Sequence, residues 1–191
     1  SIGNIVGSNI FNVLLVLGIP AVIAGIKVNK GAFKDAFYMI LISILMLVLI
    51  IVPIDPMPGF SIGITEGLIM LFVFGLYLRK MYTDADSQKD PRDMIKSDNL
   101  KKDIIITGAG IAGIGIGGQL LVDNGRMLAI SFGVPEVIIG LTLMALGTSL
   151  PELAASAVSA IKGKHEIAIG NVIGSNIFNI LLVGGSASAI S

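Results

Sequence analysis

Long apolar stretches alternate with short polar segments along the whole chain. A bilayer crossing needs about 20 apolar residues, and stretches of about that length occur six times. The predicted spans are residues 1–26, 36–54, 56–78, 104–122, 137–161 and 167–191. Two of them contain a carboxylate: Glu66 near the start of the third and Glu152 in the middle of the fifth. This pattern predicts an all-α membrane protein with six transmembrane helices.

One hydrophilic stretch, residues 83–99, interrupts the apolar pattern. Its composition is typical of a solvated linker, and it lacks the ligand spacing of an EF-hand calcium loop. We therefore expect three parts: residues 1–82 as part of a first membrane half, residues 83–102 as a loop, and residues 103–191 as part of a second membrane half.

The charged residues predict the orientation. All but one of the 13 Lys and Arg residues lie in the loops after the first, third and fifth spans, and Arg126 lies on the other side. The positive-inside rule places the basic loops in the cytoplasm, with both chain ends outside. We expect an integral protein of the cell membrane.

Composition narrows the functional classes. Hydrophobic residues make up 54% of the chain and charged residues 14%, which is too apolar for a soluble domain of this size. The formal net charge is zero, so no basic field indicates nucleic acid. The absence of cysteine excludes disulfides and zinc-thiolate sites. Because the chain has no initiator Met, we expect an internal fragment of a longer protein.

A decapeptide occurs twice, at residues 3–12 and 170–179, with the pattern Gly-Asn-x-x-Gly-Ser-Asn-Ile-Phe-Asn. The copies lie on the first and sixth spans. An odd number of crossings separates them, so the two helices are expected to run antiparallel. Inverted repeats of this kind place substrate sites near the membrane midplane, between the halves.

Within each copy, polar side chains recur every four residues and form one stripe along a helix. They are Asn4, Ser8 and Asn12 in the first copy, and Asn171, Ser175 and Asn179 in the second. Small residues and amides also pack membrane helices together, which is the structural alternative. Packing alone does not require three amide or hydroxyl groups per stripe in both copies, so the stripes predict two walls of a polar site.

Glu152 is the second candidate feature. A carboxylate at this depth costs roughly 2.5–3.5 kcal/mol on insertion scales and usually marks an ion or proton pathway. A lone glutamate neutralised by a proton is the alternative. Pro151 removes the hydrogen bond to the Gly147 carbonyl, so we expect the helix to kink or unwind over residues 147–149.

The fifth span concentrates oxygen ligands around this position. Glu152, the hydroxyls of Thr148 and Ser149, and carbonyls near Ala145 are hard oxygen donors. Such donors suit Na⁺ and Ca²⁺ rather than soft metals. The candidate cation ligands are therefore Asn4, Ser8, Asn12, Ala145, Thr148, Ser149, Glu152, Asn171, Ser175 and Asn179.

Residues 145–152, Ala-Leu-Gly-Thr-Ser-Leu-Pro-Glu, followed by residues 170–179 resemble the second α-repeat of the cation/Ca²⁺ exchanger superfamily, which includes the Na⁺/Ca²⁺ exchangers. Residues 3–12 resemble the latter half of the first α-repeat. The resemblance covers essentially the whole chain. It implies a ten-helix inverted-repeat fold in which the six spans are helices three through eight.

The resemblance also implies a single central site that binds Na⁺ and Ca²⁺ in alternation, with Glu152 as the principal ligand. The residues implied around it are Thr148, Ser149, the Ala145 carbonyl, Ser175 and Asn179, with Ser8 and Asn12 from the first repeat. The chain departs from the family pattern twice. It lacks the first-repeat helix with a matching Pro-Glu, and it has Asn179 where some members carry Asp.

We therefore predict a secondary antiporter that exchanges Ca²⁺ for Na⁺ by alternating access. Its partners would be these ions, the lipid bilayer and the missing helices of the full-length protein, with no cofactor. Ca²⁺/H⁺ antiport stays open because a midplane Glu can carry a proton, and a passive cation channel is a rival from another class.

An enzyme is the remaining alternative, because Gly108, Gly110 and Gly113 match a Gly-x-Gly-x-x-Gly dinucleotide fingerprint. The acidic residue that should follow about 20 positions later is missing, since Asp123 comes too early. A glycine series in an apolar span more simply allows close helix packing. We therefore predict that the protein is not an enzyme.

Overall fold

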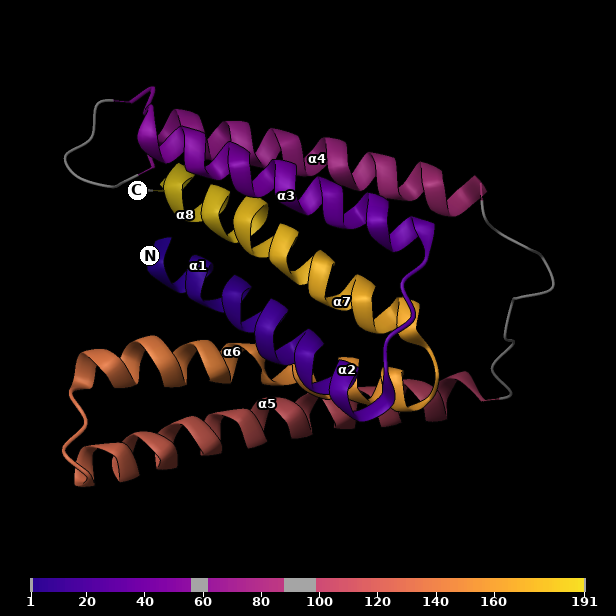
Figure 1. Ribbon diagram of the computed structural model, residues 1–191, viewed down its shortest axis with the longest axis vertical. Coiled ribbons are helices and arrows are strands. Elements are labelled where there is room, and N and C mark those ends of the chain that lie inside the picture. The colour runs from indigo at the N-terminus through magenta and orange to yellow at the C-terminus, as the bar shows by residue number, and fades with distance from the viewer. Residues whose placement is uncertain (1, 56–61, 88–98, 191) are drawn as a thin grey trace.

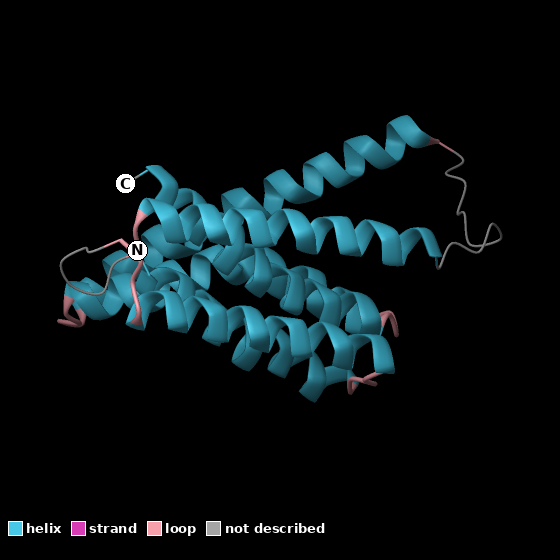
Figure 2. Cartoon of the chain, turned by 90° about the horizontal axis from the view of Figure 1, so that it is seen from above, coloured by secondary structure: helices cyan, strands magenta, loops and turns pink. Residues whose placement is uncertain are grey.

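A computed structural model describes residues 2–55, 62–87 and 99–190, and for part of α6 only the backbone. The helices, in order, are α1 (Ile2–Phe11), π-helix η1 (Asn12–Leu17), α2 (Gly18–Ala24), α3 (Lys30–Ile51), α4 (Ile64–Ser87), α5 (Leu100–Ser131), α6 (Glu136–Ile161), α7 (His165–Phe178), π-helix η3 (Asn179–Gly184) and α8 (Gly185–Ile190). Every regular element in these ranges is a helix (Figure 2). Because α1, η1 and α2 run on without a break, as do α7, η3 and α8, the described ranges contain six long helical segments, as predicted.

Four segments are long and apolar enough to cross a membrane by length and composition alone: Ile2–Ala24, Lys30–Ile51, Leu100–Ser131 and His165–Ala189. Helix α4 is of similar length but carries Glu66, Arg79 and Lys80. It begins later than the predicted third span and runs past Leu78 to Ser87, so the predicted loop over residues 83–102 is helical at both ends. Beyond the apolar stretch, Lys80 and Asp84 pair one turn apart, 2.7 Å from Nζ to Oδ2, which adds a few tenths of a kcal/mol (about 0.2–0.5) to helix stability.

The two decapeptide helices lie side by side at the centre of the molecule and run in opposite directions (Figure 1). Helices α3 and α4 flank them on one side, where α3 packs on α7 and α4 packs on α8 and η3. Helices α5 and α6 lie on the other side, and α6 contacts α1, η1, α2 and α7. The predicted antiparallel arrangement of the repeats is confirmed.

Glycine brings α4 and α8 into close contact. A β-carbon on Gly67 would lie 2.8 Å from the Gly185 carbonyl oxygen, and one on Gly185 would lie 3.0 Å from the Gly67 carbonyl oxygen. Only residues without a side chain allow the two backbones to approach this closely. The buried apolar core lies beside this contact and includes Met70, Ile177 and Leu181.

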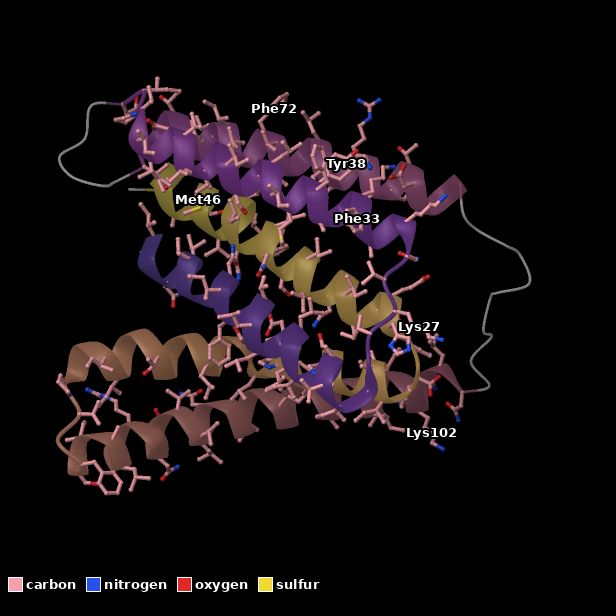
Figure 3. The ribbon with its side chains drawn as sticks, in the orientation of Figure 1. Lys27, Phe33, Tyr38, Met46, Phe72 and Lys102 are labelled. Carbon is pink, nitrogen blue, oxygen red and sulfur yellow. The ribbon has the colours of Figure 1, made fainter. Side chains whose placement is uncertain are left out.

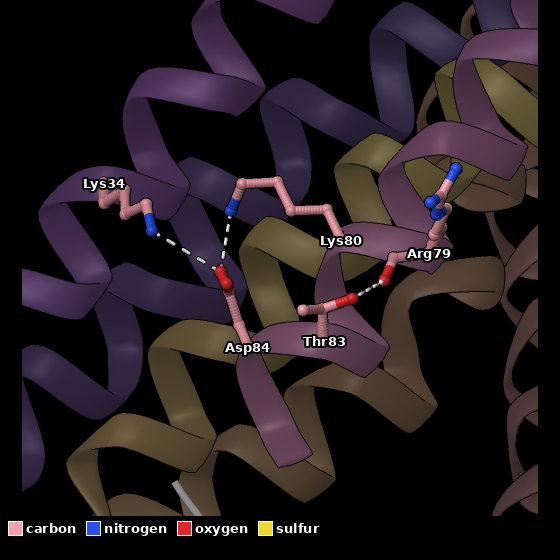
Figure 4. A network of polar contacts seen from close by, with 5 residues as sticks. All are labelled: Lys34, Arg79, Lys80, Thr83 and Asp84. Carbon is pink, nitrogen blue, oxygen red and sulfur yellow. Dashed lines mark hydrogen bonds and ion pairs between the residues drawn. The ribbon is translucent and has the colours of Figure 1, made fainter. Parts of the chain in front are cut away.

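The basic segments gather at one end of the bundle. Lys27 and Lys102 lie at the same end (Figure 3), while the chain termini and the α5–α6 turn lie at the opposite end (Figure 1). At the basic end, Asp84 accepts from Lys80 at 2.7 Å and from Lys34 at 3.4 Å, which joins α3 to α4 (Figure 4). The alternation of charge along the sequence therefore corresponds to a separation in space.

Of the expected kink or unwinding before Pro151, the unwinding does not occur, because α6 is α-helical from Glu136 to Ile161 with Pro151 inside it. The residues before Gly108 lie inside α5, so the strand that a dinucleotide fingerprint requires is not there.

Glu66, near the start of the predicted third span, is fully buried. Its Oε1 accepts the backbone N–H groups of Ile54 at 2.6 Å and Asp55 at 3.0 Å. The Asp55 carboxylate in turn accepts the Thr65 N–H at 2.8 Å and its hydroxyl at 3.0 Å. The hydrogen bonds of the two carboxylates thus hold the segment after α3 against the first turn of α4.

Candidate cation site

Amide side chains from the two decapeptide copies meet between α1 and α7. Asn12 Nδ2 donates to Asn176 Oδ1 at 2.9 Å, and Asn179 Nδ2 donates to Asn9 Oδ1 at 3.1 Å. Asn9 Nδ2 donates to the Asn176 carbonyl at 3.3 Å, and Asn176 Nδ2 donates to the Asn9 carbonyl at 3.4 Å. Each bond has its counterpart when the two copies are exchanged, so the four amides form a network with two-fold pseudosymmetry. We call these four residues the amide network.

The backbone changes at the same position in both copies. The π-helix η1 begins at Asn12, and η3 begins at Asn179, the last residue of each decapeptide. A π-helical turn inserts an extra residue into an α-helix and frequently marks a functional site. The repeated sequence therefore specifies a repeated irregularity next to the amide network.

Glu152 lines a cavity of about 360 Å³ between α4, α6 and α7. Its Oε2 atom is buried and makes no hydrogen bond to any residue that the structure describes. Asn171, Ser175 and Asn179 supply further polar groups to the cavity, and side chains of α4 such as Phe74 and Tyr77 close one side. A buried carboxylate oxygen beside amide and hydroxyl oxygens matches the ligands preferred by Na⁺ and Ca²⁺.

Asn171 joins the helix of Glu152 to the second decapeptide. Its Nδ2 donates to the Glu152 carbonyl at 3.0 Å and to Ser156 Oγ at 2.9 Å. Ser156 is fully buried and donates to the Ala168 carbonyl at 3.4 Å. Both donor hydrogens of Asn171 are thus used to hold α6 against α7, which fixes the position of Glu152 relative to the second copy.

The structure brings many of the predicted residues together. Glu152, Asn171, Ser175 and Asn179 line one cavity. Ser149, Ser8 and Asn12 are buried, and Asn12 joins the second copy through the amide network. Asn4, in contrast, is exposed and does not line the Glu152 cavity. Ala145 and Thr148 lie in α6, but their side chains are outside the described part of the chain.

Three polar residues near the site were not predicted. Asn9 and Asn176 occupy the seventh position of the decapeptide, next to the predicted stripe, and their repetition was the available signal. Ser156 follows Glu152 by four residues, which places the two on one helix face. Asn9 and Asn176 fall outside the four-residue period of the stripe, and Ser156 lies outside both decapeptides.

The site has one carboxylate. Among the described residues, no group of three or more His, Cys, Asp or Glu side chains could hold a metal. A larger cavity of about 550 Å³ between α1, η1 and α3 is lined mainly by apolar side chains such as Ile10 and Met46. Hard cations require oxygen ligands, so the smaller cavity beside Glu152 is the better candidate.

A family profile described as "Sodium/calcium exchanger protein" matches residues 1–82 and 102–191. The "Putative antiporter CaxA" of Alkalimonas amylolytica is 35% identical over 199 residues, which cover 100% of this chain and 60% of the relative. The "Sodium/calcium exchanger MaX1" of Methanosarcina acetivorans is 31% identical over 219 residues, which cover 96% of this chain and 63% of the relative.

The fold is similar to that of a solved protein. A structure described as "Structure of Sodium/Calcium Exchanger from Methanococcus jannaschii" aligns with a TM-score of 0.75 at 30% identity, covering 98% of this chain and 58% of that chain. The chain thus spans about three fifths of the length of the proteins that it matches.

Proposed function

We propose, since this chain belongs to the sodium/calcium exchanger protein family, that the full-length protein is an antiporter that exchanges Ca²⁺ for Na⁺ across a membrane. The observation that carries the proposal is that Glu152, whose Oε2 is buried and unpartnered among the described residues, lines a cavity together with Asn171, Ser175 and Asn179. The relatives named as exchangers and antiporters support the same class of transport. No enzymatic step is part of the proposal.

The coordination chemistry of Ca²⁺ determines how many oxygen ligands and how much negative charge the site requires. Ca²⁺ takes six to eight oxygen ligands at about 2.3–2.6 Å, and one carboxylate balances only half of its charge. Glu152 would be the principal ligand, with Ser149, Ser175 and Asn179 as neutral donors. The hydroxyl of Thr148 and the carbonyl of Ala145 belong to the same proposed set, together with Ser8 and Asn12 from the first repeat.

A second carboxylate from the remaining helices of the full-length protein would complete the charge. Two negative charges in one site hold either a single Ca²⁺ or several Na⁺ ions, but not both at once. Exchange follows if only the occupied protein switches between the two membrane faces. We place the Lys- and Arg-rich end of the bundle in the cytoplasm, following the positive-inside rule.

The test is uptake of radiolabelled Ca²⁺ by the full-length protein in vesicles with an imposed Na⁺ gradient. We expect Glu152→Gln to abolish this uptake, because the amide keeps the shape of the side chain but loses the charge that attracts the cation. Asp123→Asn removes an exposed carboxylate on α5 and is expected to transport normally. Undiminished uptake by the Glu152→Gln protein would refute the site assignment.

Ca²⁺/H⁺ antiport is the second candidate, favoured by the single glutamate in the cavity, since a carboxyl group at this depth can carry a proton. The same vesicles distinguish the two, because uptake would then follow an imposed pH gradient and ignore a Na⁺ gradient. A passive channel would let Ca²⁺ cross without any counter-ion.

A further inference from the structure

We infer that Asn9 and Asn176 are positioning residues that orient the amide oxygens of Asn12 and Asn179 for cation binding, each acting on the opposite copy of the repeat. The inference rests on the proposed function. Its basis is the amide network, in which Asn176 holds Asn12 at 2.9 Å and Asn9 holds Asn179 at 3.1 Å.

The network determines which way each amide faces. A backbone carbonyl can only accept a hydrogen bond. Asn176 therefore turns its Nδ2 toward the Asn9 carbonyl at 3.4 Å, and Asn9 turns its Nδ2 toward the Asn176 carbonyl at 3.3 Å. This leaves the Oδ1 atoms of Asn9 and Asn176 as acceptors for the next pair of amides.

The amide oxygens of Asn176 and Asn9 in turn determine the orientation of the Asn12 and Asn179 side chains. Because each faces an amide oxygen, each must present its Nδ2 there and its own oxygen on the other edge. Asn12 Oδ1 is buried and makes no hydrogen bond within the described ranges. Asn179 borders the cavity that contains Glu152. A desolvated amide oxygen without a donor is costly, and a bound cation would offset that cost.

Burial protects one half of the network. Asn12 is 1% exposed and Asn176 is 2% exposed, so water does not compete for their polar atoms, whereas Asn9 and Asn179 are half-buried. The remaining Asn176 contact, from Nδ2 to Met39 Sδ at 3.4 Å, is to a weak acceptor. A pair that served only to join α1 and α7 would need the two bonds to backbone carbonyls alone. The bonds to Asn12 and Asn179 are additional.

The experiment is calorimetric titration of the purified full-length protein with Ca²⁺ and, separately, with Na⁺. Loss of one oriented ligand is expected to raise the Kd for Ca²⁺ about tenfold in Asn9→Ala and in Asn176→Ala, as for the loss of one buried hydrogen bond. Asn124→Ala is the matched control, because Asn124 is exposed on α5 and bonds only within its own helix, to the Leu120 carbonyl at 2.6 Å.

Double variants separate positioning from a general loss of packing. If Asn176 acts through Asn12, adding Asn176→Ala to Asn12→Ala should weaken binding no further, and the same should hold for Asn9→Ala added to Asn179→Ala. The crossed pairs, Asn9 with Asn12 and Asn176 with Asn179, should be additive. Leu variants, which nearly preserve the shape of Asn, replace any Ala variant that does not fold.

The outcomes separate the two proposals. The coupled pairs are Asn176 with Asn12 and Asn9 with Asn179. If the wild type binds Ca²⁺ but the effects within these pairs are additive, the inference alone is overturned. The same follows if the single variants bind like the wild type. A wild type that binds neither ion overturns the proposed function and the inference with it. Non-additive effects on Ca²⁺ binding that are confined to the two coupled pairs support both the proposed function and the inference.

Discussion

Glu66 and Glu152 both lie in apolar stretches of the chain, and their surroundings separate their roles. Glu66 is fully buried, and its Oε1 accepts two backbone N–H groups from the segment after α3. The Oε2 atoms of both residues are buried and have no hydrogen-bond partner among the described residues. Glu152 differs because it lines a cavity with Asn171, Ser175 and Asn179, which Glu66 does not border. Glu66 therefore supports the fold, and Glu152 is the carboxylate that we propose for the cation.

Replacing Glu66 should cost stability. In Glu66→Ala, the N–H groups of Ile54 and Asp55 lose their acceptor, and a hydrogen bond to a charged group contributes about 1.5–3 kcal/mol. We expect a clear fall in the melting temperature of the purified protein, and a smaller fall in Glu66→Gln, whose amide oxygen still accepts. Equal melting temperatures for Glu66→Ala and the wild type would show that the hydrogen bonds of Glu66 do not stabilise the fold.

The elements of the bundle are held by different contacts at its two ends. At the basic end, α3 and α4 are joined by Lys34, Lys80 and Asp84, and Lys80 Nζ also lies 4.4 Å from the centroid of the Tyr38 ring. At the other end, α4 and α8 meet at Gly67 and Gly185. The first contact depends on charge and the second on shape, so only the first should respond to pH.

The pKa shifts of Asp84 and Lys80 determine how the stability that this contact contributes changes with pH. The hydrogen bond from Lys80 holds the pKa of Asp84 below its ordinary value of 3.8, and Asp84 holds the pKa of Lys80 above its ordinary value of 10.5. The Asp84 contribution is therefore present above pH 3.8 and is lost as the pH falls through the lowered pKa. The Lys80 contribution is present below pH 10.5 and is lost as the pH rises through the raised pKa.

We expect Asp84→Asn to melt slightly below the wild type at neutral pH, because these side chains are 35–55% exposed and solvent screens the pair. The difference should shrink below pH 3.8 and vanish as the pH falls through the lowered pKa of Asp84. Melting curves of both proteins from acid to neutral pH provide the measurement. A difference that persists unchanged in acid would exclude the ion pair as its cause.

At the scale of the whole molecule, the inverted repeat accounts for both the site and the topology. The two decapeptide helices run antiparallel at the centre, and the basic segments share one end of the bundle. Because the chain contains no cysteine, single cysteines can report which side of the membrane each end faces.

We expect Lys27→Cys and Lys162→Cys to react with an impermeant maleimide only after the cells are permeabilised, and Ser131→Cys to react in intact cells. These positions are exposed, and the basic ones should be cytoplasmic. Cysteines elsewhere in the full-length protein would be replaced first. Labelling of Lys27→Cys in intact cells would reverse the proposed orientation.

Much of the fold could be predicted because membrane helices are specified locally. Apolar length determines a span, and the position of Lys and Arg determines the alternation of ends, so the six segments and their antiparallel repeats were predicted correctly. Local patterns did not decide two features. The helix did not unwind before Pro151 within α6. Glu66 accepts backbone N–H groups from the segment after α3, a tertiary contact that its place in an apolar stretch does not reveal.

The sequence alone determined the membrane class and the inverted repeat and made Glu152 a candidate ligand, because hydropathy, period and a charge in an apolar stretch can be read within a window of about 20 residues. Only the tertiary structure decided which polar atoms are satisfied and which are available to an ion. The partners of Asn12 and Asn179 lie 164 and 170 residues away along the chain. A hydrogen bond between such distant residues forms only once the helices pack, so its role as a structural bond or a ligand support is a property of the folded molecule.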